Sequence, residues 1–221
     1  MLSILASRGT PPWLRPSLIA LSAAILVGAS AIAIAHVSSG STRRPVAVFL
    51  GDSVTEGIGA SRPSRDYVSL LAARRGWRAV DKGIGGTGYT NPGSAHITFG
   101  QRVARDVTAF EPDVVVIAGG LTDDKAQPTA LRAAVYEVIE AVRQGTPTAK
   151  IVVVGPFDPR PTVTPSERDA AAQAGVPFLD PVAEAWLSPS SLTADRVHPN
   201  DAGHAAIALR LDTDLDALRF P

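Results

Sequence analysis

Apolar runs and segments of helical periodicity alternate along most of the chain. Runs of consecutive apolar and β-branched residues are typical of strands in a parallel sheet that is covered on both faces. They predict strands over residues 46–50, 77–80, 113–118, 151–155 and 176–179. Apolar residues at helical spacing predict helices over 64–76, 99–110, 128–145, 166–175 and 201–218. This alternation predicts an α/β fold, a three-layer α/β/α sandwich with a mainly parallel sheet of about five strands.

Capping residues mark the ends of several of these helices. Ser64 and Asn200 carry side chains that accept hydrogen bonds from the first backbone N–H groups of a helix. Pro128 suits the first turn of the longest predicted helix, because a proline there loses no hydrogen bond. Gly76 is placed to end the helix that Ser64 begins.

The amino-terminal part of the chain has a different pattern. Residues 17–37 are uncharged and rich in apolar side chains, and as a helix they would be about 31 Å long, the thickness of a bilayer core. Arg8 and Arg15 precede this stretch and predict an extracytoplasmic location for the rest of the chain. Ala33-Ile34-Ala35 resembles a cleavage site, so residues 1–37 are predicted to be a signal peptide or an uncleaved membrane anchor. A buried soluble helix is less favoured, since it rarely lacks a polar face.

Composition narrows the classes of function. Residues 38–45 are polar and predict a linker, which leaves residues 46–221 as one folded domain. The 21 basic and 21 acidic residues balance, so no nucleic-acid partner is expected. The chain contains no cysteine, which excludes disulfides, thiol nucleophiles and cysteine zinc sites.

Polar loops that come after the predicted strands carry the candidate chemistry. They are Gly51-Asp52-Ser53 and residues 83–88, 119–123 and 195–200. Because the carboxyl ends of parallel strands share one edge of a sheet, these loops are expected to converge. A lone serine in such a turn more often caps a helix. A hydrolytic serine also needs a histidine base, an acid that orients the histidine, and donors for an oxyanion.

Four blocks in these loops resemble a known family. They are Gly51-Asp52-Ser53-Val54, the glycine loop after the second strand, a Gly-x-x-Asp segment at residues 120–123, and Asp195-Arg196-Val197-His198. Together they resemble the SGNH hydrolases, also called the GDSL esterase and lipase family, from about residue 46 to residue 204. The resemblance implies an SGNH/flavodoxin-like fold.

The resemblance also implies roles for particular residues. Ser53 corresponds to the nucleophile, and its backbone N–H corresponds to the first oxyanion donor. Gly86 corresponds to the second donor, with Gly85 as a less favoured registration. His198 corresponds to the general base, and Asp195 to the acid that orients it.

The third block departs from the family pattern at Thr122. The family has an asparagine there, whose amide donates to the oxyanion, whereas the chain reads Gly120-Leu121-Thr122-Asp123. Loss of one oxyanion donor typically lowers the rate by about 100- to 1000-fold. A threonine hydroxyl is able to donate in its place, but it is shorter and also rotates to accept.

The predicted function is that of an extracytoplasmic serine esterase or lipase that hydrolyses carboxylic esters through an acyl-enzyme. No metal or organic cofactor is implied, and the expected partner is a small-molecule, lipid or glycan ester, with a membrane contact if residues 17–37 stay uncleaved. One alternative is an envelope acyltransferase or deacylase acting on a glycan or lipid. The other is a binding domain of the same fold with weakened catalysis, which Thr122 suggests.

Two other interpretations of these loops are less favoured. Gly83, Gly85 and Gly88 fit a dinucleotide pattern, but that pattern must open a helix and a loop sequence comes next here. Asp195, His198 and His204 suggest a metal site, but Pro199 and Asn200 separate the histidines. His204 is expected to be an ordinary position on the last helix. The remaining aromatic candidates are His96 and Tyr89, as surface or cleft residues, and Trp77 and Trp186, as packing residues.

Overall fold

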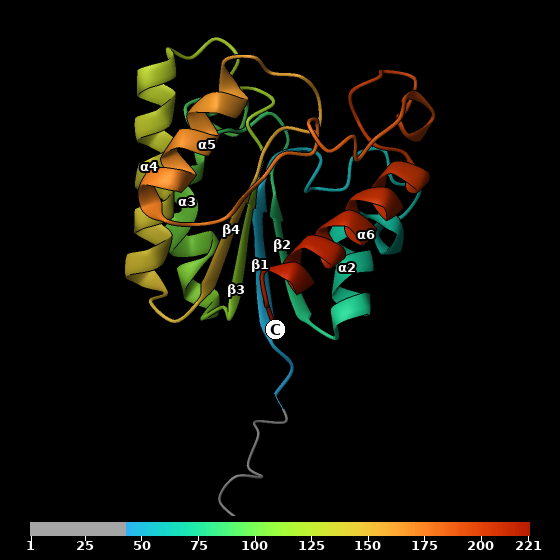
Figure 1. The fold of residues 1–221 in the computed structure, drawn as a ribbon, viewed down its shortest axis with the longest axis horizontal. Coiled ribbons are helices and arrows are strands. Elements are labelled where there is room, and N and C mark those ends of the chain that lie inside the picture. Colours follow the sequence, from blue (N-terminus) through green and yellow to red (C-terminus); the bar gives the residue numbers. More distant parts are fainter. Residues whose placement is uncertain (1–42) are drawn as a thin grey trace, which may run out of the picture. The chain divides into compact units, whose positions relative to one another are not determined.

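A computed structural model describes residues 43–221. The predicted strands form a five-stranded sheet, and its four longer strands are labelled in Figure 1. The strands are β1 (Val46–Gly51), β2 (Arg78–Gly83), β3 (Val114–Ala118), β4 (Lys150–Val154) and β5 (Phe178–Leu179). Their order is β2-β1-β3-β4-β5, and each neighbouring pair is parallel. The predicted parallel sheet is therefore confirmed.

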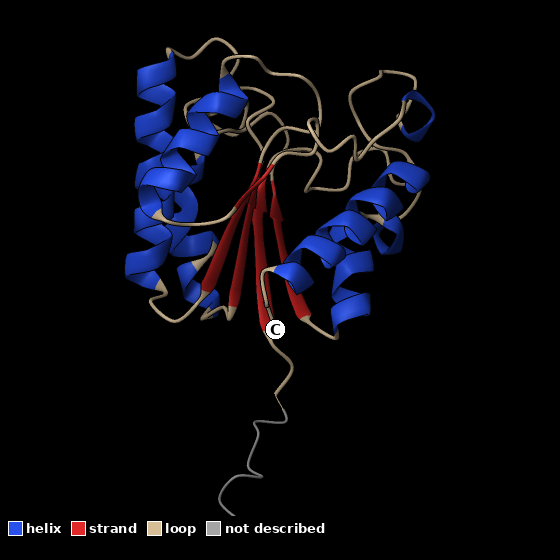
Figure 2. Cartoon of the chain, in the orientation of Figure 1, coloured by secondary structure: helices blue, strands red, loops and turns tan. Residues whose placement is uncertain are grey.

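Helices cover both faces of this sheet (Figure 2). They are α2 (Tyr67–Arg75), α3 (Phe99–Asp106), α4 (Pro128–Gly145), α5 (Val163–Ala174) and α6 (Asp201–Ala217). Successive residues of a strand point to opposite faces, so Ala47 and Phe49 of β1 pack with α2 and α6. Val48 and Leu50 pack with α3, α4 and α5. The three-layer sandwich is confirmed.

The strands at the edges of the sheet differ from the prediction. β2 continues to Gly83 instead of ending at residue 80, and each of its residues pairs with β1. It is half exposed, and its last three residues, Asp81-Lys82-Gly83, continue no apolar run, so the sequence pattern does not reveal its full length. β5 pairs through two residues only. Trp77 precedes β2 and is buried, as its packing role predicted, with Nε1 donating to the carbonyl of Pro221 at 2.9 Å.

Some helix ends also differ. Asp66 rather than Ser64 caps α2, because its carboxylate accepts from the backbone N–H of Ser69, and Ser64 lies in a short 3-10 turn, Pro63–Arg65. The predicted helix over 99–110 ends at Asp106, and a separate 3-10 turn, Thr108–Phe110, comes after it. α5 begins three residues before Ser166.

Other helix boundaries agree with the prediction. α4 begins at Pro128 and ends at Gly145. Asn200 caps α6, and its Oδ1 accepts from the N–H groups of Ala202 and Gly203. Within residues 43–221 no helix is both long enough and apolar enough to span a bilayer. The predictions for residues 1–37, and for most of the linker, lie outside the described residues.

Candidate active site

Ser53 lies in a tight turn at the carboxyl end of β1. A side chain at Gly51 would place its Cβ 2.0 Å from Thr55 Oγ1 and 2.5 Å from the carbonyl oxygen of Ala118, so only glycine fits where the turn begins. Asp52 is buried and accepts from the N–H of Val54 at 3.0 Å. Burial raises the pKa of Asp52 to about 6. The turn leaves Ser53 half-buried at the edge of the sheet.

The predicted nucleophile, base and acid come together in one hydrogen-bonded chain. His198 Nε2 lies 2.9 Å from Ser53 Oγ, and His198 Nδ1 lies 2.7 Å from Asp195 Oδ2. A proton on Nδ1 bonded to the carboxylate leaves Nε2 as the acceptor that faces the serine. The arrangement joins residues that lie 145 positions apart in the chain.

Asp195 is oriented by its own turn. Its Oδ1 accepts from the N–H groups of Val197 at 2.9 Å and His198 at 3.0 Å, and from the hydroxyl of Thr193 at 2.7 Å. The hydrogen bond from His198, together with these donors, holds the pKa of Asp195 well below its usual range, although half of the side chain is exposed. Arg196 has a left-handed backbone, with φ of 61°, at the tip of this turn. The carboxylate is therefore ionised and fixed beside the imidazole.

The two candidate oxyanion glycines of the glycine loop differ in whether their backbone N–H groups are already hydrogen-bonded. The N–H of Gly85 donates to Glu56 Oε2 at 2.7 Å and is thereby occupied. Gly86 adopts φ of 75°, and a Cβ there would meet no atom within 4 Å. The N–H groups of Ser53 and Gly86 have no acceptor in the described part of the chain. This geometry favours Gly86 over Gly85 as the oxyanion donor.

Thr122 stands on the opposite loop, after β3. Its Oγ1 is buried and has no hydrogen-bond partner among residues 43–221. Its carbonyl accepts from Asn91 Nδ2 at 3.1 Å, which ties it to the glycine loop. The hydroxyl is thus uncommitted, and because its oxygen is buried it must rotate towards the cleft before it donates to an oxyanion.

Asp123, in the loop after β3, accepts several hydrogen bonds from the glycine loop. Its Oδ2 accepts from the N–H of Tyr89 at 2.9 Å, and its Oδ1 accepts from the N–H groups of Thr90 at 2.8 Å and Asn91 at 3.0 Å. The Thr90 hydroxyl also donates to Oδ1 at 2.5 Å. Asp123 is buried, so this network fixes the backbone of residues 89–91, in the loop that also carries Gly86.

Three further side chains around the site have no signature in the sequence. Glu56 accepts from the backbone of Gly85. Arg102 is fully buried beneath the glycine loop. Glu167 of α5 is also fully buried, and its Oε1 would lie 2.2 Å from a Cβ at Gly120. Each of these side chains contacts a segment that lies far away in the sequence, so no local sequence motif reveals its position.

The other sequence candidates occupy different places. Tyr89 is buried against Phe99, with ring centroids 4.9 Å apart, so it is not a surface residue. His96 is exposed, and Trp186 is buried, as its packing role predicted. His204 is more than an ordinary helix position, because it is buried with Nδ1 3.3 Å from the N–H of Tyr67.

The structure also bears on the two less favoured interpretations. Gly83 ends β2, and the residues from Ile84 to Thr98 form loops and turns, so the glycine pattern does not open a helix. In the portion described, no group of three or more histidine, aspartate or glutamate side chains is arranged to hold a metal ion.

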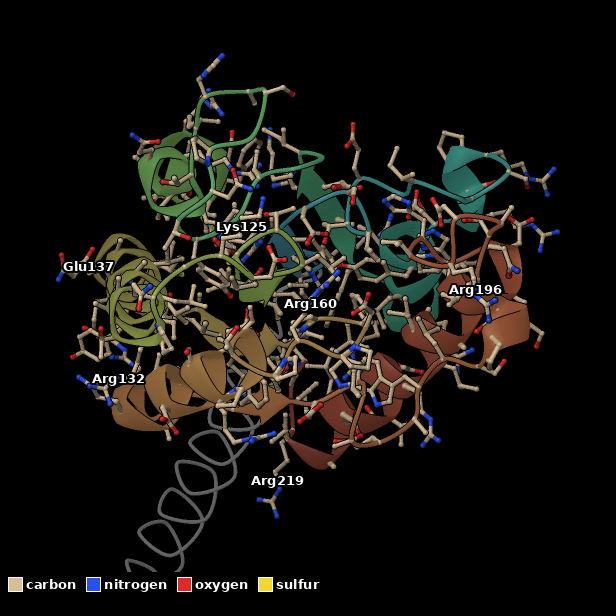
Figure 3. All side chains as sticks on the ribbon, turned by 90° about the horizontal axis from the view of Figure 1, so that it is seen from above. Lys125, Arg132, Glu137, Arg160, Arg196 and Arg219 are labelled. Carbon is tan, nitrogen blue, oxygen red and sulfur yellow. The ribbon has the colours of Figure 1, made fainter. Side chains whose placement is uncertain are left out.

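A hollow of about 340 Å³ adjoins the turn that carries Asp195 and His198. Leu192 and Arg196 of that turn form one wall, and the loop after β4 forms another through Phe157 and Pro159. Figure 3 views this edge of the sheet from above, with Arg196 labelled on the turn and Arg160 on the loop after β4. The remaining lining residues are mainly apolar: Asp158, Pro181, Val182, Ala185, Leu187, Ser188 and Pro189.

Comparison with known proteins gives one sequence family. Residues 49–206 match the GDSL-like Lipase/Acylhydrolase family. A GDSL lipase of Mycobacterium tuberculosis is 36% identical over 186 residues, which cover 74% of this chain and 78% of that protein.

Solved structures share the fold at lower identity. TesA superposes with a TM-score of 0.65 at 22% identity, covering 78% of this chain and 99% of TesA. A carbohydrate esterase family 2 enzyme from Corynascus thermopiles superposes with a TM-score of 0.68 at 20% identity, covering 79% of this chain and 66% of that one. A two-domain esterase active on acetylated mannans superposes with a TM-score of 0.65 at 22% identity, covering 80% of this chain and about half (51%) of that one.

The fold and the sequence match define a serine hydrolase that acts on ester bonds. The chain belongs to the GDSL-like lipase/acylhydrolase family.

Proposed function

We propose that the chain is an extracytoplasmic esterase or lipase that works through Ser53, His198 and Asp195. The hydrogen-bonded chain of these three side chains is the observation that carries the proposal. The uncharged stretch of residues 17–37, with arginines before it, supports the location.

In the acylation step, Ser53 Oγ attacks the ester carbonyl while His198 Nε2 takes the hydroxyl proton. The carbonyl oxygen becomes an oxyanion that accepts from the N–H groups of Ser53 and Gly86 and from the Thr122 hydroxyl. When the tetrahedral intermediate collapses, the bond to the alcohol oxygen breaks and His198 gives the proton to the leaving alcohol. Ser53 is left as an acyl ester.

In the deacylation step, a water molecule takes the place of the alcohol. The water attacks the acyl carbonyl while His198 removes a proton from it. His198 then gives that proton to Ser53 Oγ, so that the carboxylic acid leaves and the serine is restored. The carboxylate of Asp195 stabilises the imidazolium that forms in both steps. Its depressed pKa keeps it ionised at the pH at which the histidine acts.

The mainly apolar hollow lies beside the turn of Asp195 and His198, the acid–base turn, and it favours a substrate ester with an aliphatic portion. Its volume of about 340 Å³ lies at the lower end of typical small-molecule sites, about 300–1,000 Å³. The lipase from Mycobacterium tuberculosis makes a lipid ester the favoured substrate class, and the mannan esterase makes a glycan ester the second.

A test is hydrolysis of a chromogenic ester by the full chain and by Ser53→Ala. The variant is expected to lose more than about 1000-fold in kcat, because the nucleophile is gone. Retained turnover would contradict the mechanism. An added alcohol acceptor distinguishes the acyltransferase alternative, since a transferase gives mainly the new ester and a hydrolase mainly the free acid.

A further inference from the structure

Arg102 of α3 is a buried cation that contacts three separate segments. Its side chain is fully buried. One terminal nitrogen donates to the carbonyl of Gly51 at 2.5 Å and to Thr87 Oγ1 at 3.2 Å. The other donates to the carbonyl of Lys82 at 2.8 Å. A planar guanidinium reaches several acceptors at once in a fixed geometry, which no other side chain does.

The three acceptors belong to the two halves of the candidate site. Gly51 is the last residue of β1 and precedes the turn that presents Ser53. Thr87 is the residue after Gly86 and also donates its hydroxyl to the carbonyl of Ile84 at 2.7 Å. The N–H of Ile84 in turn donates to the Gly51 carbonyl at 3.1 Å. Arg102 therefore links the serine turn directly to the glycine loop.

The charge of Arg102 is only loosely paired. The carboxylate of Asp106 lies 3.8 Å away and is itself held by Arg105 at 2.8 and 2.9 Å. The guanidinium carbon lies 5.0 Å from the centre of the Phe99 ring. Burial lowers the pKa of Arg102 to about 10, which leaves it protonated at neutral pH. A buried charge is costly, so here the backbone carbonyls and the Thr87 hydroxyl must offset its desolvation.

We infer that Arg102 is a positioning residue that sets the distance between the Ser53 nucleophile and the Gly86 oxyanion donor. The inference rests on the proposed function. Without the guanidinium, the Gly51 carbonyl and the Thr87 hydroxyl lose their common donor. The hydrogen bond from Ile84 to Gly51 remains, but Thr87, and with it Gly86, is held less tightly relative to the serine turn. A displacement of about 1 Å at such a site lowers the rate by about 100-fold. Since Arg102 does not touch substrate, substrate binding stays intact.

The experiment compares kcat and KM for Arg102→Gln and Arg102→Lys, each normalised to active serines titrated with a fluorophosphonate. Arg102→Gln is expected to lose about 10- to 100-fold in kcat with KM within about twofold. Arg102→Lys keeps the charge and is expected to recover part of the loss. Arg132→Gln is the control, because Arg132 is exposed on α4 away from these segments, and it is expected to leave kcat unchanged.

A second pair of variants leaves the arginine in place. Thr87→Val removes the hydroxyl acceptor, whereas Thr87→Ser keeps it. A fall in kcat of about 3- to 10-fold for valine, with recovery for serine, is expected if the link to the glycine loop matters. This pair decides the question should the arginine variants fail to fold.

Wild-type kcat per titrated serine in Arg102→Gln, or equal kcat in the two Thr87 variants, would overturn the inference and leave a purely structural role. These outcomes are distinguishable from failure of the proposed function. In that case the wild-type chain itself would not be labelled, or Ser53→Ala would remain active.

Discussion

Asp195 combines high exposure with a dense set of hydrogen bonds. Half of its side chain faces solvent, yet both oxygens are engaged by donors from residues 193–198. In such an exposed place the fixed geometry of the donors, more than the Coulomb energy, determines how the carboxylate acts on His198. Its contribution to catalysis is therefore expected to depend on orientation and on the tautomer of the histidine.

The substitution Asp195→Asn tests this role. The amide has nearly the same shape but does not stabilise the imidazolium and favours the wrong histidine tautomer, so kcat is expected to fall by about 100- to 10,000-fold. Steady-state kinetics on the same chromogenic ester measure the effect. Thr193→Val, which removes one donor to Asp195 and leaves the carboxylate, is the control and is expected to cost less than about tenfold. Equal effects of the two substitutions would contradict the assignment.

At the scale of elements, α5 packs a carboxyl group against the loop after β3. Glu167 is fully buried, and neither oxygen has a hydrogen-bond partner in the described residues. Burial, with Asp123, Asp52 and Asp180 as neighbouring acids, raises the pKa of Glu167 well above its ordinary value. Tyr89, whose own pKa burial raises, also faces this group. Burial therefore favours the neutral form of the Glu167 carboxyl in the folded protein.

This arrangement makes stability depend on pH. A carboxyl whose pKa is raised by folding stabilises the folded state below its unfolded pKa, about 4.3, and that contribution is lost as pH rises towards its folded value. Glu167→Gln is neutral at every pH. Its melting temperature relative to wild type is expected to rise as pH increases above about 4.3, and to level off once Glu167 ionises in the folded state. A constant difference between pH 4 and pH 9 would show that folding does not shift the pKa of Glu167.

The elements differ in how far the sequence predicts them. β1, β3, β4 and α4 have strong apolar patterns, and their bounds agree with the prediction within about one residue. β2 lies at an edge of the sheet and is half exposed, so its partner strand, not its own pattern, determines its length.

The candidate site likewise has some residues that the sequence predicts and others that it does not. Ser53, Asp195 and His198 lie in short blocks with recognisable spacing, and the structure brings them within hydrogen-bonding distance. The contacts of Glu56 with Gly85 and of Arg102 with Gly51 join segments 29 and 51 residues apart. Such contacts depend on how the loops pack, and a single sequence holds no periodic signal for them.

At the scale of the whole domain, substrate choice is expected to depend on the hollow between the loop after β4 and the acid–base turn. Val182→Trp would fill part of this hollow. We expect kcat/KM for an octanoate ester to fall about tenfold, while that for an acetate ester changes less than about twofold, because only the longer chain needs the space.

Ala205→Trp provides the control for this substitution. Ala205 lines a second hollow of about 340 Å³ between α2 and α6, together with Leu70 and Ala208. Its replacement is expected to leave the chain-length profile unchanged. If both substitutions alter the profile alike, or if neither does, the hollow beside the acid–base turn does not hold the aliphatic portion.

Labelling of the full chain with a fluorophosphonate, with mapping of the modified peptide, shows directly whether Ser53 is an activated nucleophile. One adduct is expected, at Ser53. Labelling is expected to be lost in His198→Ala, checked to be folded by circular dichroism, because the Ser53 hydroxyl remains but the base that activates it is gone. A folded wild-type chain that is not labelled, or one labelled equally well without His198, would contradict the assignment of Ser53 and His198 as nucleophile and base.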